Sequence, residues 1–148
     1  MAAGSILSEL RLTLSSHPEE INRVVVALET FAKSSHLKAA TVRVLGLMLE
    51  EFVTNSVTHG GGGRDVKITL SLKYETDHLR LSYVDNGVAF NPITDLPPDT
   101  RDKVLDERSV GGLGWPLVFH YAASVEYRRE GGQNIYELSV SADQPGEW

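Results

Sequence analysis

Residues 42–63 read VRVLGLMLEEFVTNSVTHGGGG, and this stretch decides the fold. Its apolar side chains recur every three or four residues, at Val42, Leu45, Leu49, Phe52 and Val53. This spacing predicts an amphipathic helix, and the run of glycines that follows is typical of a helix end. We therefore expect a helix over about residues 38–59 with one apolar side.

The sequence on either side of this helix predicts further elements. Apolar residues alternate over 6–14, 66–73 and 79–84, which indicates half-buried strands. A second helix is expected to open at residues 17–20 and to end near residue 34, because proline and acidic residues suit a first helical turn. A short helix is expected after Gly114, with Pro116 in its first turn, and residues 123–127 and 135–140 indicate a closing hairpin.

This order of elements favours an α+β fold in two layers, a mixed and mostly antiparallel sheet covered on one face by helices. At 148 residues the chain has the length of a single domain, spanning 1–148. The one long connection, residues 88–112, exceeds the length of ordinary loops and is typical of a lid or binding loop.

Composition excludes several classes of function. The chain has no cysteine, so thiol nucleophiles and iron–sulfur clusters are absent. Fourteen Lys and Arg against twenty Asp and Glu give a net charge of -6, which argues against a nucleic-acid surface. The sequence has no basic, apolar leader and no apolar run long enough to cross a membrane, so we expect a cytoplasmic protein. An anion would have to be bound by something other than basic side chains.

The first candidate site lies on the central helix. Glu51, Asn55 and His59 recur every four residues and form one polar stripe, roughly opposite the apolar side. Such a stripe is most often the solvent-exposed side of a helix, and a histidine in the last turn also suits the helix dipole. A carboxylate and an amide oxygen one turn apart nevertheless provide two hard oxygen donors, which suits Mg²⁺ or a positioned hydroxyl group.

Two further motifs follow in the chain. Asp85-Asn86-Gly87 comes directly after a predicted strand, and Gly111-Gly112-Leu113-Gly114 comes directly before a predicted helix. The first is also an ordinary turn signal, and the second could be a hinge. In a binding site, Asp85 would accept a hydrogen bond from an amine, and free N–H groups after the glycines would bind phosphate oxygens. The P-loop and the Gly-x-Gly-x-x-Gly fingerprint are both absent.

In series, the three motifs resemble the GHKL (histidine-kinase-like) ATPase superfamily, and within it the anti-sigma-factor serine/threonine protein kinases. The resemblance covers nearly the whole chain. It implies that the chain binds ATP and Mg²⁺ and transfers phosphate to a serine or threonine of an anti-anti-sigma-like protein, with a sigma factor as a further partner. It also implies a homodimer formed through the N-terminal region and a mobile ATP lid over about residues 91–111.

The resemblance also assigns roles to individual residues. Glu51 would be the general base, and Asn55 would bind the Mg²⁺ that bridges the ATP phosphates. Asp85 would bind the adenine amine beside Gly87, while Gly111, Gly112, Leu113 and Gly114 would surround the phosphates. His59 ends the motif that contains Asn55, as a further nucleotide-binding position.

Three departures and two alternatives accompany this resemblance. Ala89 occupies the place of a second glycine that sensor histidine kinases usually have, and the chain has no phosphoacceptor helix pair. Trp115 replaces the usual aliphatic residue and is expected to crowd or line the pocket.

The alternatives to a kinase are a nucleotide-gated binding module with little or no catalysis and a scaffold with an empty pocket. The apolar N-terminal residues expected in a dimer could equally pack the core.

Overall fold

The computed structural model describes residues 6–60, 65–95 and 114–144. The elements follow in the order β1 (Ile6–Ser15), α1 (Glu20–Ser35), α2 (Ala39–Asn55), the π-helical turn η1 (Ser56–Gly60), β2 (Lys67–Glu75), β3 (His78–Asp85), α3 (Pro92–Asp95), α4 (Gly114–Tyr121), β4 (Ala122–Glu130) and β5 (Gln133–Ser141).

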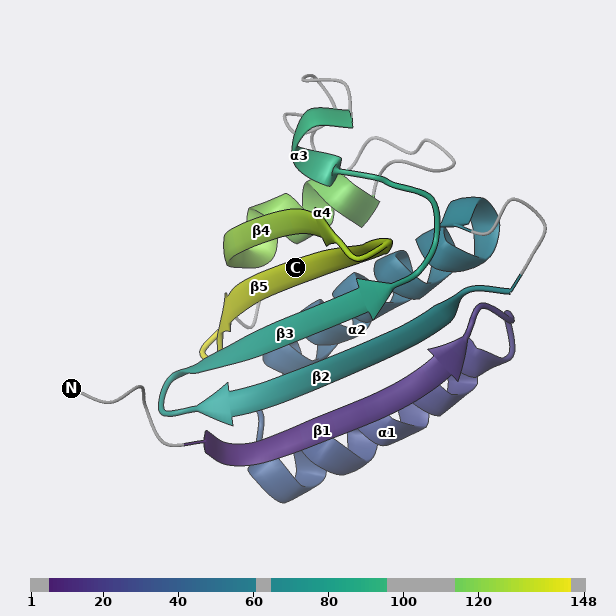
Figure 1. The fold of residues 1–148 in the computed structure, drawn as a ribbon. Coiled ribbons are helices and arrows are strands. Elements are labelled where there is room, and N and C mark those ends of the chain that lie inside the picture. Colours follow the sequence, from purple (N-terminus) through teal and green to yellow (C-terminus); the bar gives the residue numbers. More distant parts are fainter. Residues whose placement is uncertain (1–5, 61–64, 96–113, 145–148) are drawn as a thin grey trace.

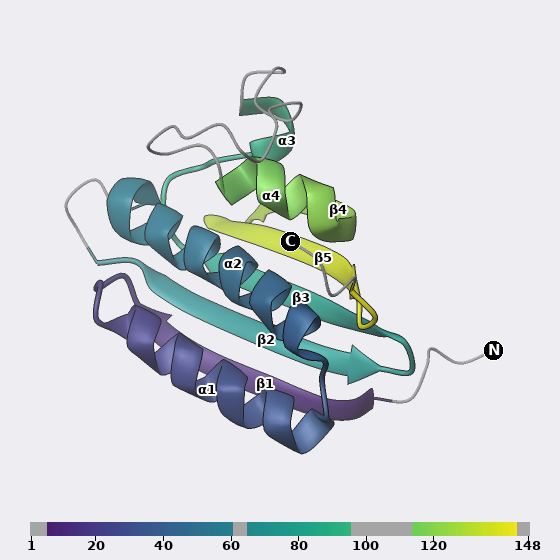
Figure 2. The same cartoon turned by 180° about the vertical axis from the view of Figure 1, so that it is seen from behind.

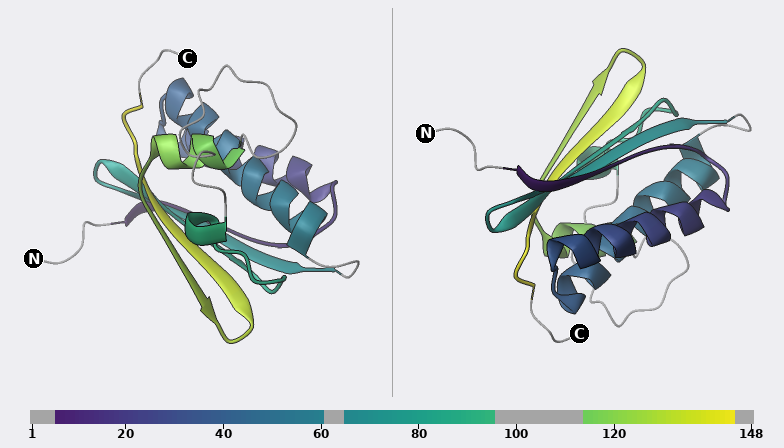
Figure 3. Two further views of the ribbon diagram at one scale, coloured as in Figure 1. Left: turned by 90° about the horizontal axis from the view of Figure 1, so that it is seen from above. Right: turned by 90° about the horizontal axis from the view of Figure 1, so that it is seen from below.

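The strands form one five-stranded sheet in the order β1-β2-β3-β5-β4. Every neighbouring pair among the described strands is antiparallel, so the expected α+β sandwich is confirmed, with an antiparallel rather than a mixed sheet. The helices α1, α2 and α4 all lie on one face of this sheet (Figures 1 and 2). Figure 3 shows the two layers edge-on, with the opposite face of the sheet left without a helix.

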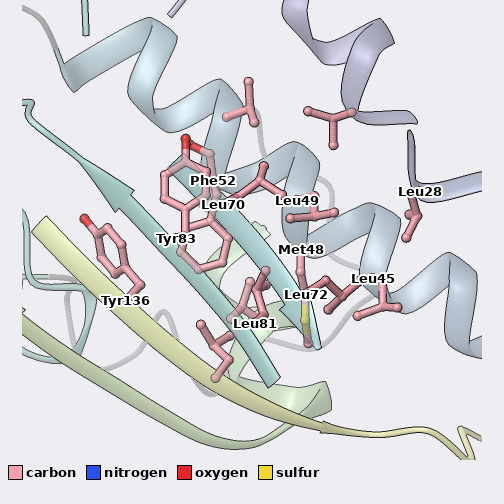
Figure 4. Packing of buried hydrophobic residues seen from close by; sticks show 14 of the residues in the cluster. Leu28, Leu45, Met48, Leu49, Phe52, Leu70, Leu72, Leu81, Tyr83 and Tyr136 are labelled. Atoms are coloured by element: carbon pink, nitrogen blue, oxygen red, sulfur yellow. The ribbon is translucent and has the colours of Figure 1, made fainter. Parts of the chain in front are cut away.

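The core fills the space between α2 and the central strands. Leu45, Leu49 and Phe52 on α2 are at most 2% exposed, and they face Leu70 on β2 and Tyr83 on β3 (Figure 4). The alternating pattern in β2 and β3 places every second side chain on this face, because successive residues of a strand point to opposite sides. The apolar spacing of the sequence therefore located both layers of the core.

The boundaries of the helices differ slightly from those expected. Helix α1 begins at Glu20, after a turn that contains Pro18, so the proline precedes the helix instead of opening it. Helix α2 ends at Asn55 and continues as η1, where the backbone widens into a π turn. The one-turn helix α3 was not expected, and it begins after Asn91, whose side-chain oxygen accepts a hydrogen bond from the Ile93 N–H at 2.9 Å.

Most of the N-terminal apolar residues pack the core. Leu14, Val24 and Leu28 are buried, and Leu10 and Leu12 are partly buried against them, whereas Val25 remains 46% exposed. Within the described residues, no helix is both long and apolar enough to span a membrane.

Candidate functional site

A pocket of about 140 Å³ opens where the C-terminal end of α2 meets the end of β3. Its walls combine polar groups with the apolar side chains of the segment after β3. The lining residues are Asn55, Asp85, Val88, Ala89, Phe90, Asn134 and Tyr136. The structure therefore brings together two of the motifs that the sequence singled out, from positions thirty residues apart.

Asp85 lines this pocket and is 4% exposed. Its Oδ1 accepts hydrogen bonds from the Gly87 N–H at 3.1 Å and from Asn134 Nδ2 at 2.8 Å. Its Oδ2 accepts one from the Ser56 hydroxyl at 2.8 Å. The expected turn at Asp85-Asn86-Gly87 is present, but its carboxylate is held by groups from three elements and not only by the local backbone.

Two tyrosines support this arrangement from the core side. The Tyr83 hydroxyl lies 2.8 Å from Ser56 Oγ, and the Tyr136 hydroxyl donates to the Phe90 carbonyl at 2.9 Å. Burial, first of all, and the charge of Asp85 both raise the pKa of each phenol, so both remain neutral donors. The pocket wall is thus tied to the sheet by hydrogen bonds that persist at ordinary pH.

Asn55 and Glu51 occupy the last two turns of α2. The Asn55 side chain is half-buried and lines the pocket, whereas Glu51 lies one turn earlier and does not line it. His59 lies in η1, and its side chain is outside what the structure describes. A π turn directly after Asn55 is notable because π-helical turns are frequent at functional sites.

Burial, first of all, and the charge of the neighbouring Glu50 carboxylate together raise the pKa of Glu51 to about 7. Glu50 itself is exposed. Among the described residues, no side chain donates a hydrogen bond to the Glu51 carboxylate. A half-buried carboxyl group with a pKa near neutrality has the acidity that proton transfer at pH 7 requires.

The glycine motif is only partly described. Gly111, Gly112 and Leu113 lie outside the described residues, as does most of the expected lid over 91–111, of which residues 91–95 are described. Gly114 begins α4, as expected. The next residue, Trp115, contacts Phe90 in the pocket wall with ring centroids 5.9 Å apart, so the end of the motif lies close to the pocket.

Trp115 is not among the described residues that line the pocket, which corrects the expectation that it would line it. It is 2% exposed and packs against Phe52 edge-to-face at 5.0 Å and against Tyr136 at 6.0 Å. A large aromatic ring at the start of α4 is drawn into the core because burying its surface outweighs the loss of a partner for its Nε1.

A larger hollow of about 620 Å³ lies on the face of the sheet that has no helix. Its lining is mainly charged and hydroxyl side chains, including Arg11, Lys73, Arg80, Glu126 and Glu137. None of Glu51, Asn55 and Asp85 takes part in it. Size alone therefore does not locate the candidate site.

The donor set at the pocket suits Mg²⁺ bound together with phosphates. Within the part of the chain that is described, no three His, Cys, Asp or Glu side chains gather as a metal cluster. Mg²⁺ in nucleotide sites is commonly bound by one or two protein oxygens with phosphates and waters completing its shell. The Asn55 amide oxygen fits that role, because the side chain faces the pocket and is hydrogen-bonded to no other described residue.

A comparison with protein families identifies the family of the chain. The family model described as the histidine kinase-like ATPase domain matches residues 14–140. The chain belongs to this family. The matched range includes every residue that lines the candidate pocket.

The chain is also similar to individual protein kinases. The chain is 31% identical over 113 residues to the serine/threonine-protein kinase BtrW of Bordetella bronchiseptica, covering 76% of this chain and 79% of BtrW. It is 26% identical over 114 residues to the serine-protein kinase RsbW of Listeria monocytogenes, covering 74% of this chain and 73% of RsbW.

A solved structure shares the fold. It contains the RsbU and RsbW domains of Rv1364c from Mycobacterium tuberculosis, and it matches with a TM-score of 0.60 at 17% identity. The match covers 93% of this chain, which spans about a third, 33%, of that longer chain.

Sequence reasoning missed two polar residues of the site. Ser56 and Asn134 are both 1% exposed, and both bond Asp85. Asn134 could have been noticed as the one amide in the inward-facing row that continues with Tyr136, Leu138 and Val140. Ser56 follows Asn55 on the buried side of the helix, where a serine without a partner would be costly.

Proposed function

We propose that the chain is an ATP- and Mg²⁺-dependent serine/threonine protein kinase of the anti-sigma regulatory type. It phosphorylates an anti-anti-sigma-like partner, sequesters a sigma factor, or does both. The observation that carries this proposal is the placement of Glu51 and Asn55 on consecutive turns of α2, with Asn55 facing the Asp85 pocket and Glu51 holding a pKa of about 7. The kinase names of BtrW and RsbW support the same reading.

Each residue has a defined part in this proposal. Asp85 accepts a hydrogen bond from the amine of adenine, and the Val88–Phe90 segment packs on the base beside Gly87. The N–H groups of residues 111–114 bind the phosphates, and His59 is a further nucleotide-binding position. Asn55 would hold the Mg²⁺ ion, which when bound would supply positive charge to neutralise the phosphates.

Glu51 acts on the protein substrate. In its ionised form the carboxylate accepts the proton of a serine or threonine hydroxyl as that oxygen bonds the γ-phosphorus. The bond between the γ-phosphorus and the bridging oxygen breaks, and ADP leaves with the electron pair. A base with a pKa near 7 is ionised in about half of the molecules at pH 7, so the rate of transfer should rise as pH increases through 7.

The test is transfer of labelled γ-phosphate from ATP to small anti-anti-sigma-like proteins of the same organism. Glu51→Gln should lower the transfer rate by a factor of ~10²–10⁴ without removing ATP binding. Glu50→Gln is the matched control, because that neighbouring carboxylate is exposed and should leave transfer largely intact. Unchanged transfer in Glu51→Gln would remove the base assignment.

A nucleotide-gated binding module is the second candidate, and one observation favours it. Glu51 does not line the pocket, whereas the groups needed to bind a nucleotide do. This alternative predicts ATP affinity that Asp85→Asn weakens, with no turnover.

The N-terminal homodimer remains part of the proposal, with the exposed Val25 and Val26 of α1 as its available apolar surface.

A further inference from the structure

Asn134 is the most completely bonded polar side chain of the pocket. It is 1% exposed at the start of β5, and its register partner on β3 is Asp85. Directly paired residues of antiparallel strands point to the same face, so the two side chains meet on the helix-covered side of the sheet.

The hydrogen bonds fix which way the Asn134 amide faces. Its Oδ1 accepts from the Phe90 N–H at 3.2 Å and from the Tyr127 hydroxyl at 2.6 Å. Its Nδ2 donates to Asp85 Oδ1 and to the Val88 carbonyl, both at 2.8 Å. A flipped amide would set its oxygen against two acceptors and its N–H₂ against the Phe90 N–H donor, so only one orientation satisfies the site.

These four bonds use the whole capacity of the Asn134 side chain. A primary amide has two donor hydrogens and two acceptor lone pairs on its oxygen. Asn134 therefore lines the pocket without having a hydrogen bond to offer a ligand. Any effect it has on a ligand must pass through the groups that it holds.

The group that it holds most directly is the Asp85 carboxylate. Asp85 Oδ1 already accepts two hydrogen bonds, from Asn134 and Gly87, while Oδ2 accepts one from Ser56. A carboxylate oxygen accepts about two hydrogen bonds. The remaining acceptor of this carboxylate is therefore on Oδ2, and the bonds to Oδ1 and Oδ2 prevent the group from rotating.

We infer that Asn134 is a positioning residue that makes Asp85 a selective reader of an exocyclic amine on the nucleotide base. The inference rests on the proposed function, because it assumes that the pocket binds a purine nucleotide. A base with an amine at this place donates to the free acceptor, whereas a base with a carbonyl oxygen there would place two acceptors together. Without Asn134, only the Gly87 N–H and the Ser56 hydroxyl hold the carboxylate, so its orientation is less restricted and the preference weakens.

Asn134 also holds the wall of the pocket, so its two effects must be separated. Its bonds to Val88 and Phe90 join both ends of the segment that would pack on the base. Loss of this wall would weaken every purine nucleotide alike. Loss of the Asp85 orientation would weaken only nucleotides that carry the amine.

The experiment compares ATP with purine riboside 5′-triphosphate, which lacks the amine, by calorimetric titration with Mg²⁺. The wild-type chain should bind ATP about 10- to 100-fold more tightly than the amine-free nucleotide, the range expected for a hydrogen bond to a charged group. In Asn134→Ser this ratio should fall to within about 3-fold of unity. Asn22→Ser, at an exposed position of α1, is the matched control and should keep the wild-type ratio.

Tyr127→Phe adds a milder variant if Asn134→Ser folds poorly. It removes one bond to Asn134 Oδ1 and leaves both donors on Nδ2 in place, so it should lower the ratio only in part. An Asn134→Ser protein that binds both nucleotides more weakly by the same factor, with the ratio unchanged, would overturn the inference. A wild-type chain that binds both equally would also overturn it while leaving nucleotide binding intact, whereas a wild-type chain that binds neither would overturn the proposed function itself.

Discussion

At the scale of a single residue, Glu51 combines a raised pKa with an expected cost in stability. Its position on the half-buried side of α2 makes the ionised form costly, and the same burial gives it a pKa of about 7. The raised pKa that suits the proposed proton transfer is therefore expected to reduce the stability of the fold at neutral and higher pH.

This cost can be measured as a dependence of stability on pH. The folded chain retains a proton on Glu51 up to about pH 7, while the unfolded chain loses it near the ordinary value of 4.5. Between these values the folded state binds more protons, so the contribution of Glu51 to the free energy of unfolding falls as pH rises. Glu51→Gln removes this effect and should gain about 1–3 kcal/mol relative to the wild type between pH 5 and pH 8.

Urea denaturation at both pH values would measure the difference, with Glu29→Gln on the exposed side of α1 as the control. An equal stability difference between Glu51→Gln and the wild type at pH 5 and at pH 8 would show that the pKa of Glu51 is not raised.

At the scale of the element, α4 is held to the core through Trp115. The ring packs against Phe52, Phe90 and Tyr136, while its Nε1 has no hydrogen-bond partner among the described residues. Trp115→Ala should cost about 3–5 kcal/mol, because it leaves a large cavity between α2 and α4. Trp115→Phe keeps most of the contacts and removes the unpaired N–H, so it should cost less than about 1 kcal/mol.

Chemical denaturation of the two variants separates packing from polarity. If Trp115→Phe proved as destabilising as Trp115→Ala, the indole N–H would have to contribute a hydrogen bond that this structure does not contain.

The sequence predicted some of the helices and strands and missed others. The spacing of Leu45, Leu49 and Phe52 predicted α2, and the alternation in β2 and β3 predicted the sheet, because both patterns follow from burial on one side. Helix α3 was not predicted, because a single turn capped by Asn91 is too short to show a periodic spacing of apolar residues. Trp115 was misplaced because the sequence does not show that Phe52, Phe90 and Tyr136 leave room for an indole in the core.

At the scale of the whole molecule, the candidate site is assembled by sheet order. Asp85 at the end of β3 and Asn134 at the start of β5 are register partners although they are far apart in the sequence. The C-terminal end of α2 and the start of η1 lie beside this pair and supply Asn55 and Ser56. The motifs around Asn55 and Asp85 could be found in the sequence, but Ser56 and Asn134 required the strand pairing to be known.

The central claim is that this pocket binds ATP with Mg²⁺ through Asp85 and Asn55. Calorimetric titration of the wild-type chain with ATP and Mg²⁺ tests it most directly. The expected result is saturable binding at one site, weakened at least about tenfold when Mg²⁺ is chelated or when Asp85 is replaced in Asp85→Asn, and unchanged in the control Asp77→Asn at an exposed turn. No heat of binding with the wild-type chain, or equal affinity in Asp85→Asn, would contradict the account.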